Sequence, residues 1–198
     1  MIIGLTGQTG AGKSEVCKLL NNDKITVINC DLVARKITEK GSDALNELVL
    51  AFGKQILCKD KTLDRKKLAS LAFKDKQSTQ LLNKITHPHI INEIKKQIIN
   101  ANTEYTILDA PTLFESGADK LCDRTVAVIA DENIRINRII KRDNLSREDA
   151  LLRLSAQKDQ SFFVNNCDYI IKNDGDLSAL KNDSIGTLST LDPLADID

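Results

Sequence analysis

The chain opens on a short apolar run that breaks into a glycine-rich loop, in the sequence MIIGLTGQTGAGKSEVCKLL. Residues 7–14 fit the pattern G-x-x-x-x-G-K-[ST], and an apolar-periodic stretch follows them. A strand before such a loop and a helix after it let backbone N–H groups point at phosphates, because glycines carry no obstructing Cβ. The helix N-terminus adds the positive end of its dipole. The opening therefore predicts an α/β fold that holds a nucleoside triphosphate.

Two side chains of this loop carry chemistry of their own. We expect the ammonium of Lys13 to bridge the β- and γ-phosphates and the hydroxyl of Ser14 to bind Mg²⁺. Glu15 stands where threonine is frequent, and its carboxylate is unfavourable beside the α-phosphate unless it points outward, although its backbone N–H still serves. The residues predicted to contact the nucleoside triphosphate from this loop are Gly7, Gln8, Thr9, Gly10, Ala11, Gly12, Lys13, Ser14 and Glu15.

The composition narrows the class of protein. At 198 residues, the chain corresponds to one domain or to one core with insertions. Its 28 basic and 28 acidic residues cancel, which argues against a globally basic nucleic-acid binder. Neither a bilayer-length apolar run nor a basic leader is present, so we expect no membrane span and no signal peptide. The five cysteines are scattered without a C-x-x-C pair, which predicts core thiols and a cytoplasmic protein.

Five short apolar runs recur along the chain with helical segments between them. Continuous runs of this kind suit strands that are buried on both faces of a parallel sheet, so we predict a doubly wound α/β fold. The predicted strands are residues 1–6, 25–29, 105–109, 125–130 and 169–171.

Two helical insertions are expected beside the sheet. The long stretch between the second and third strands keeps apolar residues at helical spacing, and Pro88 is predicted to open a helix there. In the arginine-rich stretch 133–157, Ser146 with Asp149 three residues later resembles a helix start. After residue 175 we expect a short helix and then a loosely held end, whose acidic residues are Asp192, Asp196 and Asp198.

Polar residues at strand ends are candidates for chemistry, because ligands of open α/β sheets bind at the carboxyl ends of strands. Asp31 follows the second strand and either accepts the proton of an acceptor hydroxyl or caps a helix. Asp109 is the last residue of the third predicted strand, and it either lies near Mg²⁺ or is an ordinary carboxylate at a strand end. His87 either contacts a substrate or caps the helix at Pro88. The arginines of 133–157 either stabilise a transferring phosphoryl group or form a solvated helical face.

Seven stretches, taken in order, resemble the dephospho-CoA kinase family. They are residues 7–14, CDLVAR, LDRKKLASLAF, HPHI, APTLFE, KRDNLSREDALLRLSAQ and CDYIIKNDG, and they run from about residue 2 to residue 175. The resemblance implies a P-loop NTPase fold with a doubly wound parallel five-stranded sheet, a helical substrate-binding insertion and a small helical lid. The nucleotide-binding core would be residues 1–35, 105–132 and 158–198, the CoA domain 36–104 and the lid 133–157.

The resemblance also implies the reaction. ATP, with Mg²⁺ as cofactor, would phosphorylate the 3′-hydroxyl of the ribose of dephospho-CoA, giving coenzyme A and ADP in the final step of CoA biosynthesis. The expected partners are therefore these two small molecules, with no nucleic acid and no membrane. We expect a monomer or a weak homo-oligomer.

Individual roles follow from the matching motifs. Asp31 matches the family's proposed base, Arg142 matches a nucleotide-contacting lid arginine, and Asn173 lies in the motif that helps to hold the adenine of ATP. The expected catalytic residues are Lys13, Asp31 and Arg142, the expected metal ligands are Ser14 and Asp109, and the expected substrate contacts are Asp31, Arg35, Arg65, His87 and Pro111. The chain departs from the family where Asn29 replaces a frequent Asp and Thr112 a usual Leu, and its C-terminal helix looks shorter.

Two other classes compete with this interpretation. A different small-molecule kinase would keep the phosphate loop and the arginines but change the helical insertion. A GTPase would need N-K-x-D, and the nearest stretch, residues 83–86, lacks the Asp. The switch pattern D-x-x-G fails as well, because Thr112 occupies its glycine position after Asp109. A transporter ATPase is unsupported, since no L-S-G-G-Q occurs.

Overall fold

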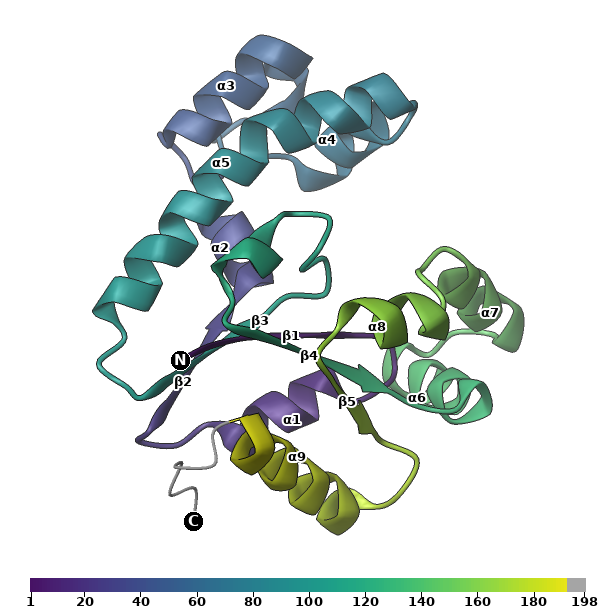
Figure 1. The fold of residues 1–198 in the computed structure, drawn as a ribbon. Helices are drawn as coiled ribbons and strands as arrows, with labels where there is room; N and C mark the ends of the chain where they lie inside the picture. The colour runs from purple at the N-terminus through teal and green to yellow at the C-terminus, as the bar shows by residue number, and fades with distance from the viewer. Residues whose placement is uncertain (192–198) are drawn as a thin grey trace. The chain divides into compact units, whose positions relative to one another are not determined.

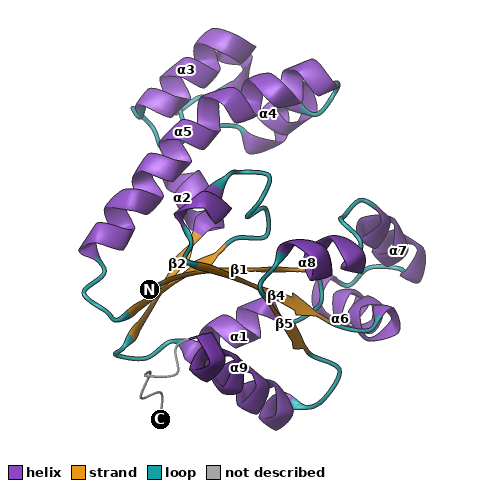
Figure 2. Ribbon diagram, in the orientation of Figure 1, coloured by secondary structure: helices purple, strands orange, loops and turns teal. Residues whose placement is uncertain are grey.

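The computed structural model describes residues 1–191, which form two compact units. One unit joins Met1–Val27 to the chain from Thr103 onward, and the other is Ile28–Asn102. Figure 1 traces the chain by residue number, and Figure 2 separates strands from helices. The predicted acidic end, with Asp192, Asp196 and Asp198, lies outside the described residues.

The five predicted strands are confirmed, and each bound lies within one residue of its prediction. They form one sheet in the order β2-β3-β1-β4-β5, whose neighbours run parallel, so the doubly wound α/β fold is confirmed too. The central strand β1 lies between β3 and β4. The strands are β1 (Ile2–Gly7), β2 (Ile25–Asn29), β3 (Tyr105–Asp109), β4 (Arg124–Ile129) and β5 (Tyr169–Lys172).

Helices cover both faces of this sheet, as Figure 1 shows for α1 and α9 on one side and α8 on the other. Successive residues of β4 point to opposite faces of the sheet, which explains why its residues 126–129 are all apolar. Val126 and Val128 belong to the core under α1 and α9, whereas Ala127 and Ile129 pack with Phe163 of α8. The helices of this unit are α1 (Lys13–Leu20), α6 (Glu132–Asp143), α7 (Arg147–Ser155), α8 (Gln160–Asn166) and α9 (Leu177–Leu191), with a 3-10 turn η2 (Ala118–Leu121).

Two helix predictions in this unit have clear outcomes. The predicted start of α7 is confirmed, because the Ser146 hydroxyl accepts a hydrogen bond from the backbone N–H of Asp149 at 3.0 Å. The helix after residue 175 is longer than predicted, with 15 residues. Its buried Leu180 and Leu188 belong to the same core as α1, and this packing extends the helix.

The second unit is built from helices around a core of its own. Leu48, Ile56 and Leu68 are buried at its centre, where α3, α4 and α5 meet. Within residues 1–191, none of the helices combines the length and the apolarity needed to cross a membrane. The elements of this unit are α2 (Cys30–Lys36), α3 (Asp43–Phe52), a 3-10 turn η1 (Lys54–Ile56), α4 (Arg65–Ala72) and α5 (Lys76–Asn100).

The predicted helix start at Pro88 is wrong. Pro88 lies inside α5, which begins at Lys76 after Asp75 caps it by accepting from the N–H of Ser78 at 2.7 Å. A proline inside a helix removes one backbone hydrogen bond and costs about 3 kcal/mol. The long helix survives because its first half packs on the core of α3 and α4 and its second half also contacts α2.

Candidate active site

The glycine-rich loop between β1 and α1 is closed by backbone that only glycine adopts easily. Gly7 and Gly12 have φ values of 146° and 102°. A Cβ at Gly7 would collide with the carbonyl oxygen of Val128, and a Cβ at Gly12 would collide with Nδ2 of Asn173. Gly7 is therefore required by a close backbone neighbour as well as by its dihedral angle, whereas Gly12 is required by its dihedral angle and lies against the amide of Asn173.

Lys13 is the first residue of α1, and its ammonium forms an ion pair with the carboxylate of Asp109. Asp109 ends β3, which pairs with β1 so that Asp109 lies opposite Leu5. The two side chains are only 13% and 7% exposed. Burial, reinforced by this carboxylate, raises the pKa of the Cys17 thiol to about 12, so a neutral thiol adjoins the pair. The structure thus brings together two residues that lie 96 positions apart in the sequence.

Asn173 and Arg138 bind carbonyl oxygens in the middle of the loop. The amide Nδ2 of Asn173 donates to the carbonyl oxygen of Ala11 at 2.7 Å, and the residue is 5% exposed. A guanidinium nitrogen of Arg138 lies 3.4 Å from the carbonyl oxygens of both Gly10 and Ala11 and donates to that of Asn173 at 3.1 Å. The sequence had singled out Asn173 but not Arg138.

Gln157 reaches the loop from the segment between α7 and α8. Its carbonyl Oε1 accepts from the backbone N–H of Thr9 at 3.0 Å, and its amide nitrogen bonds the Thr9 hydroxyl. Beside this contact, Gln8 is buried, and its Oε1 has no hydrogen-bond partner among the described residues. Gln157 was also missed by the sequence analysis, since 148 residues separate it from Thr9.

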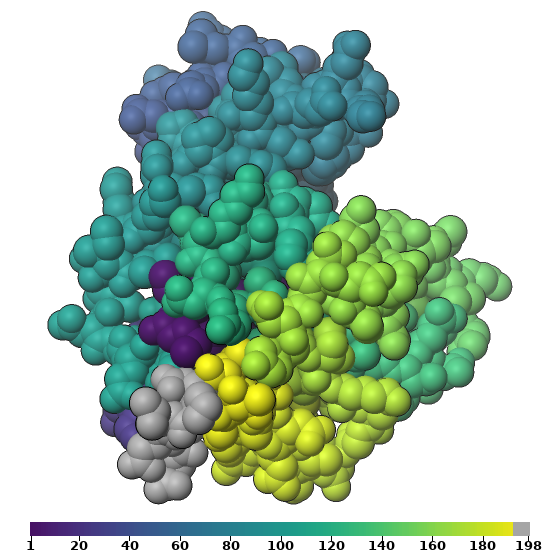
Figure 3. Space-filling model, in the orientation of Figure 1, coloured from purple at the N-terminus to yellow at the C-terminus, as the bar shows by residue number. Residues whose placement is uncertain are grey.

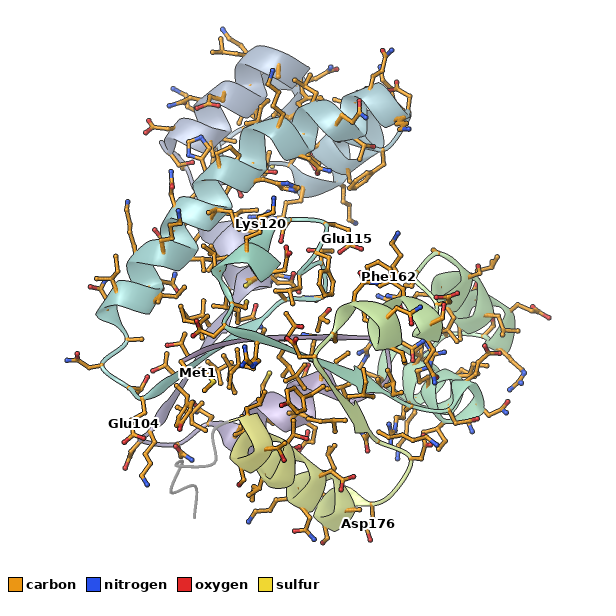
Figure 4. The ribbon with its side chains drawn as sticks, in the orientation of Figure 1. Met1, Glu104, Glu115, Lys120, Phe162 and Asp176 are labelled. Carbon is orange, nitrogen blue, oxygen red and sulfur yellow. The ribbon has the colours of Figure 1, made fainter. Side chains whose placement is uncertain are left out.

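Two cavities adjoin the loop on the side of Gln157. One of about 990 Å³ extends from Gln8 and Arg135 to the leucines of α7. The other, of about 510 Å³, contains Gly7 and Pro111 and reaches Glu115 and Lys158. Figure 4 shows Glu115 in the neighbourhood of Phe162, and Figure 3 shows the light-green segment with α7 and α8 at the surface of its unit. Pro111 is therefore beside the start of the phosphate loop.

The expected lid arginine has a different partner in this structure. Arg142 donates twice to the carboxylate of its neighbour Asp143, each time at 2.8 Å, and these bonds raise its pKa. The segment around Arg142 also buries apolar side chains. Ile136, Ile139 and Ala150 form a buried cluster between α6 and α7. Arg138, one helical turn earlier on the same face, is the arginine that contacts the loop.

The remaining expected site residues belong to the helical unit. Asn29, and not Asp31, caps α2, because its Oδ1 accepts from the N–H of Leu32 at 2.9 Å. The capping interpretation of Asp31 is therefore wrong, and its exposed side chain lies in the first helical turn. The capping interpretation of His87 is wrong as well, since His87 is inside α5, where burial lowers its pKa.

Arg65 and Arg35 are brought together at the end of α2. A guanidinium nitrogen of Arg65 donates to the carbonyl oxygen of Arg35 at 3.1 Å and to the hydroxyl of Thr38 at 3.0 Å. Thr38 is buried, and its hydroxyl in turn donates to the Arg35 carbonyl at 3.0 Å. These bonds hold the guanidinium of Arg65 beside the end of α2 and leave the exposed Arg35 side chain on the surface of its unit.

Comparison with known proteins assigns the family. The family model for dephospho-CoA kinase matches residues 1–179. The chain belongs to the dephospho-CoA kinase family. A dephospho-CoA kinase from Bacillus cereus is 38% identical over 184 residues, covering 91% of this chain and 92% of the relative. One from Fusobacterium nucleatum is 39% identical over 180 residues, covering 91% and 93%.

A solved structure agrees with the family assignment. The dephospho-CoA kinase from Campylobacter jejuni superposes with a TM-score of 0.71 at 26% identity, covering 97% of each chain. The family catalyses the last step of CoA biosynthesis, the ATP-dependent phosphorylation of dephospho-CoA. The chain is therefore a P-loop kinase and a transferase, and the rival GTPase and transporter classes are excluded.

Proposed function

We propose that this chain transfers the γ-phosphoryl group of ATP to the 3′-hydroxyl of the ribose of dephospho-CoA. The observation that carries the proposal is the buried pair of Lys13, at the start of α1, and Asp109, at the carboxyl end of β3, in a chain of this family. Ligands of parallel α/β sheets bind at that edge.

The phosphate loop would receive the donor. Its backbone N–H groups, the N-terminus of α1 and the ammonium of Lys13 together offset the charge on the β- and γ-phosphates. The residues present fit Mg²⁺, because the hydroxyl of Ser14 and the carboxylate of Asp109 are hard oxygen ligands, and phosphate oxygens and water would complete the shell. When bound, Mg²⁺ would neutralise the negative charge that develops on the phosphate oxygens during transfer.

Asp31 would act on the acceptor. Since Asn29 makes the capping bond of α2, no cap ties down the Asp31 carboxylate. It would take the proton of the 3′-hydroxyl while the new O–P bond forms and the bond from phosphorus to the bridging oxygen of ADP breaks. ADP leaves with the electron pair of that bond, and the proton passes from Asp31 to solvent.

The other expected roles belong to the same proposal. Residues 36–104 would bind the acceptor through Arg65 and His87, together with Arg35 at the end of the preceding segment and Pro111 beside the phosphate loop. Residues 133–157 would act as a lid that brings Arg142 onto the transferring group. Residues 1–35, 105–132 and 158–198 would form the nucleotide-binding core. The five cysteines are scattered without a C-x-x-C pair, as suits a reducing cytoplasm, so we place a monomeric or weakly associated enzyme there.

The experiment combines the purified chain with MgATP and dephospho-CoA and follows the products by mass spectrometry. We expect coenzyme A and ADP in equal amounts, with the new phosphate removed by a 3′-nucleotidase. Adenosine and AMP serve as competing acceptors, and dephospho-CoA should be far better, because remote binding energy positions the reacting hydroxyl. Comparable efficiency with AMP would contradict the proposal and favour another small-molecule kinase.

A further inference from the structure

We infer that Asn173 is a positioning residue of the phosphate loop, acting on the loop backbone where the resemblance implies a contact with adenine. The inference rests on the proposed function only in taking the loop as the triphosphate site. It concerns a contact between the end of β5 and the middle of the loop, 162 residues apart in the sequence.

The side chain of Asn173 is held at both ends. Nδ2 donates to the carbonyl oxygen of Ala11 at 2.7 Å, and Oδ1 accepts from Arg138 at 3.4 Å. The backbone N–H of Asn173 donates to the carbonyl of Ile129 at 2.8 Å, which fixes the residue to the end of β4. With 5% of the residue exposed, the amide faces protein and not an open base site.

The geometry of the peptide bond links this contact to phosphate binding. A trans peptide is planar, so its C=O and its N–H point in opposite directions. In the peptide between Ala11 and Gly12, the carbonyl oxygen of Ala11 points at Asn173. The N–H of Gly12 in the same peptide therefore points away from Asn173. Gly12 is the residue before Lys13 at the start of α1, where backbone N–H groups receive phosphate.

Steric contact makes the arrangement specific. A Cβ at Gly12 would displace Nδ2 of Asn173, so the amide packs directly against the loop at this glycine. Arg138 donates to the carbonyl oxygen of Gly10 at 3.4 Å, so the peptide before that of Ala11 is also held in place. Asn173 and Arg138 thus preorganise the loop, and preorganisation is what lets fixed N–H dipoles stabilise phosphate charge without reorganising during the reaction.

The test uses Asn173→Asp, which keeps the shape and replaces the donor with an acceptor. The probe is inorganic tripolyphosphate with Mg²⁺, which has phosphates but no base, and its affinity is measured by calorimetry beside those of ATP and GTP. We expect all three affinities to fall by a similar factor of ~10 or more, the effect of one lost buried hydrogen bond. The preference for ATP over GTP should stay as in the wild type.

Asn166→Asp is the matched control. The Nδ2 of Asn166 also donates to a backbone carbonyl, that of Phe162, at 2.7 Å, but at the exposed end of α8. This variant should bind tripolyphosphate as the wild type does. If Asn173→Asp does not fold, Asn173→Ala answers the same question, because it removes the donor without adding a charge.

Tripolyphosphate decides between the two roles. Unchanged tripolyphosphate affinity in a folded Asn173 variant would overturn the inference, and a lost preference for ATP over GTP would then restore the adenine contact. None of these measurements needs an acceptor. A wild-type protein that binds tripolyphosphate but fails to phosphorylate dephospho-CoA would therefore refute the proposed function and leave this inference standing.

Discussion

The pair of Lys13 and Asp109 allows a prediction about stability as well as activity. Replacing Lys13 with methionine keeps the length of the side chain and leaves the Asp109 carboxylate, 7% exposed, without its cation. Removing one partner of a buried pair costs about 3–5 kcal/mol. The lysine side chain is 13% exposed, so water reaches the ammonium. We therefore expect a loss at the lower limit of that range, about 3 kcal/mol in the free energy of unfolding.

A double-mutant cycle tests this value. Asp109→Asn removes the carboxylate charge that Lys13→Met leaves without its cation, so the double variant should lose only about 1 kcal/mol, about 2 kcal/mol less than Lys13→Met alone. The assay is urea unfolding of the ligand-free protein at neutral pH, followed by circular dichroism. Both Lys13 variants should also lose phosphoryl transfer, because the ammonium that contacts the β- and γ-phosphates is gone.

Lys18→Met provides the control, since Lys18 lies in the same helix and pairs with Glu15 at 3.1 Å on the surface, where the lysine side chain is 73% exposed. Exposed pairs contribute little, so its free energy of unfolding should stay within about 0.5 kcal/mol of the wild type. If Lys13→Met unfolds at the same urea concentration as Lys18→Met, the carboxylate is not buried against the ammonium and the reasoning fails.

Three further predictions concern other residues. Asp31→Asn should reduce kcat by ~10²–10⁴-fold with little change in ATP affinity, and wild-type turnover would remove Asp31 as the base. Arg142→Lys should lower kcat ~10-fold or more, because an ammonium lacks the planar fork, whereas the exposed Arg124→Lys should not. Burial lowers the pKa of His87, so the unfolded chain binds that proton more readily and stability is lost as pH falls below about 6.5. His87→Gln should therefore flatten the pH dependence of the urea midpoint between about pH 7.5 and 5.5, and an unchanged slope would contradict this.

Much of the fold could be predicted from the sequence, because the residue patterns that indicate strands and helices are local. The apolar runs predicted the strands, and β4 shows why, since its residues 126–129 alternate between two buried faces and are all apolar. The Pro88 error has the opposite cause. Proline has a favoured place at a helix start, but packing of α5 along its length overrides that preference. Local propensity cannot report such tertiary contacts.

The site was only partly predictable for a related reason. The phosphate loop is contiguous in sequence, so Lys13 and the glycines were identified, and strand topology indicated Asp109. Arg138 and Arg142 are four residues apart and share a helix face, so spacing alone does not say which one reaches the loop. In the structure Arg142 donates two hydrogen bonds to the carboxylate of Asp143, whereas Arg138 donates to the loop.

The contacts that hold the loop share one property that explains why sequence patterns miss them. Asn173, Arg138 and Gln157 all bond to backbone groups of the loop, namely the carbonyls of Gly10 and Ala11 and the N–H of Thr9. Backbone N–H and C=O groups have the same chemistry in every residue. The sequence of the loop therefore does not indicate which side chains bond to its backbone. The loop depends on side chains supplied by the end of β5, by α6 and by the segment after α7. Substitutions more than 120 positions away should therefore alter triphosphate affinity without touching the nucleotide.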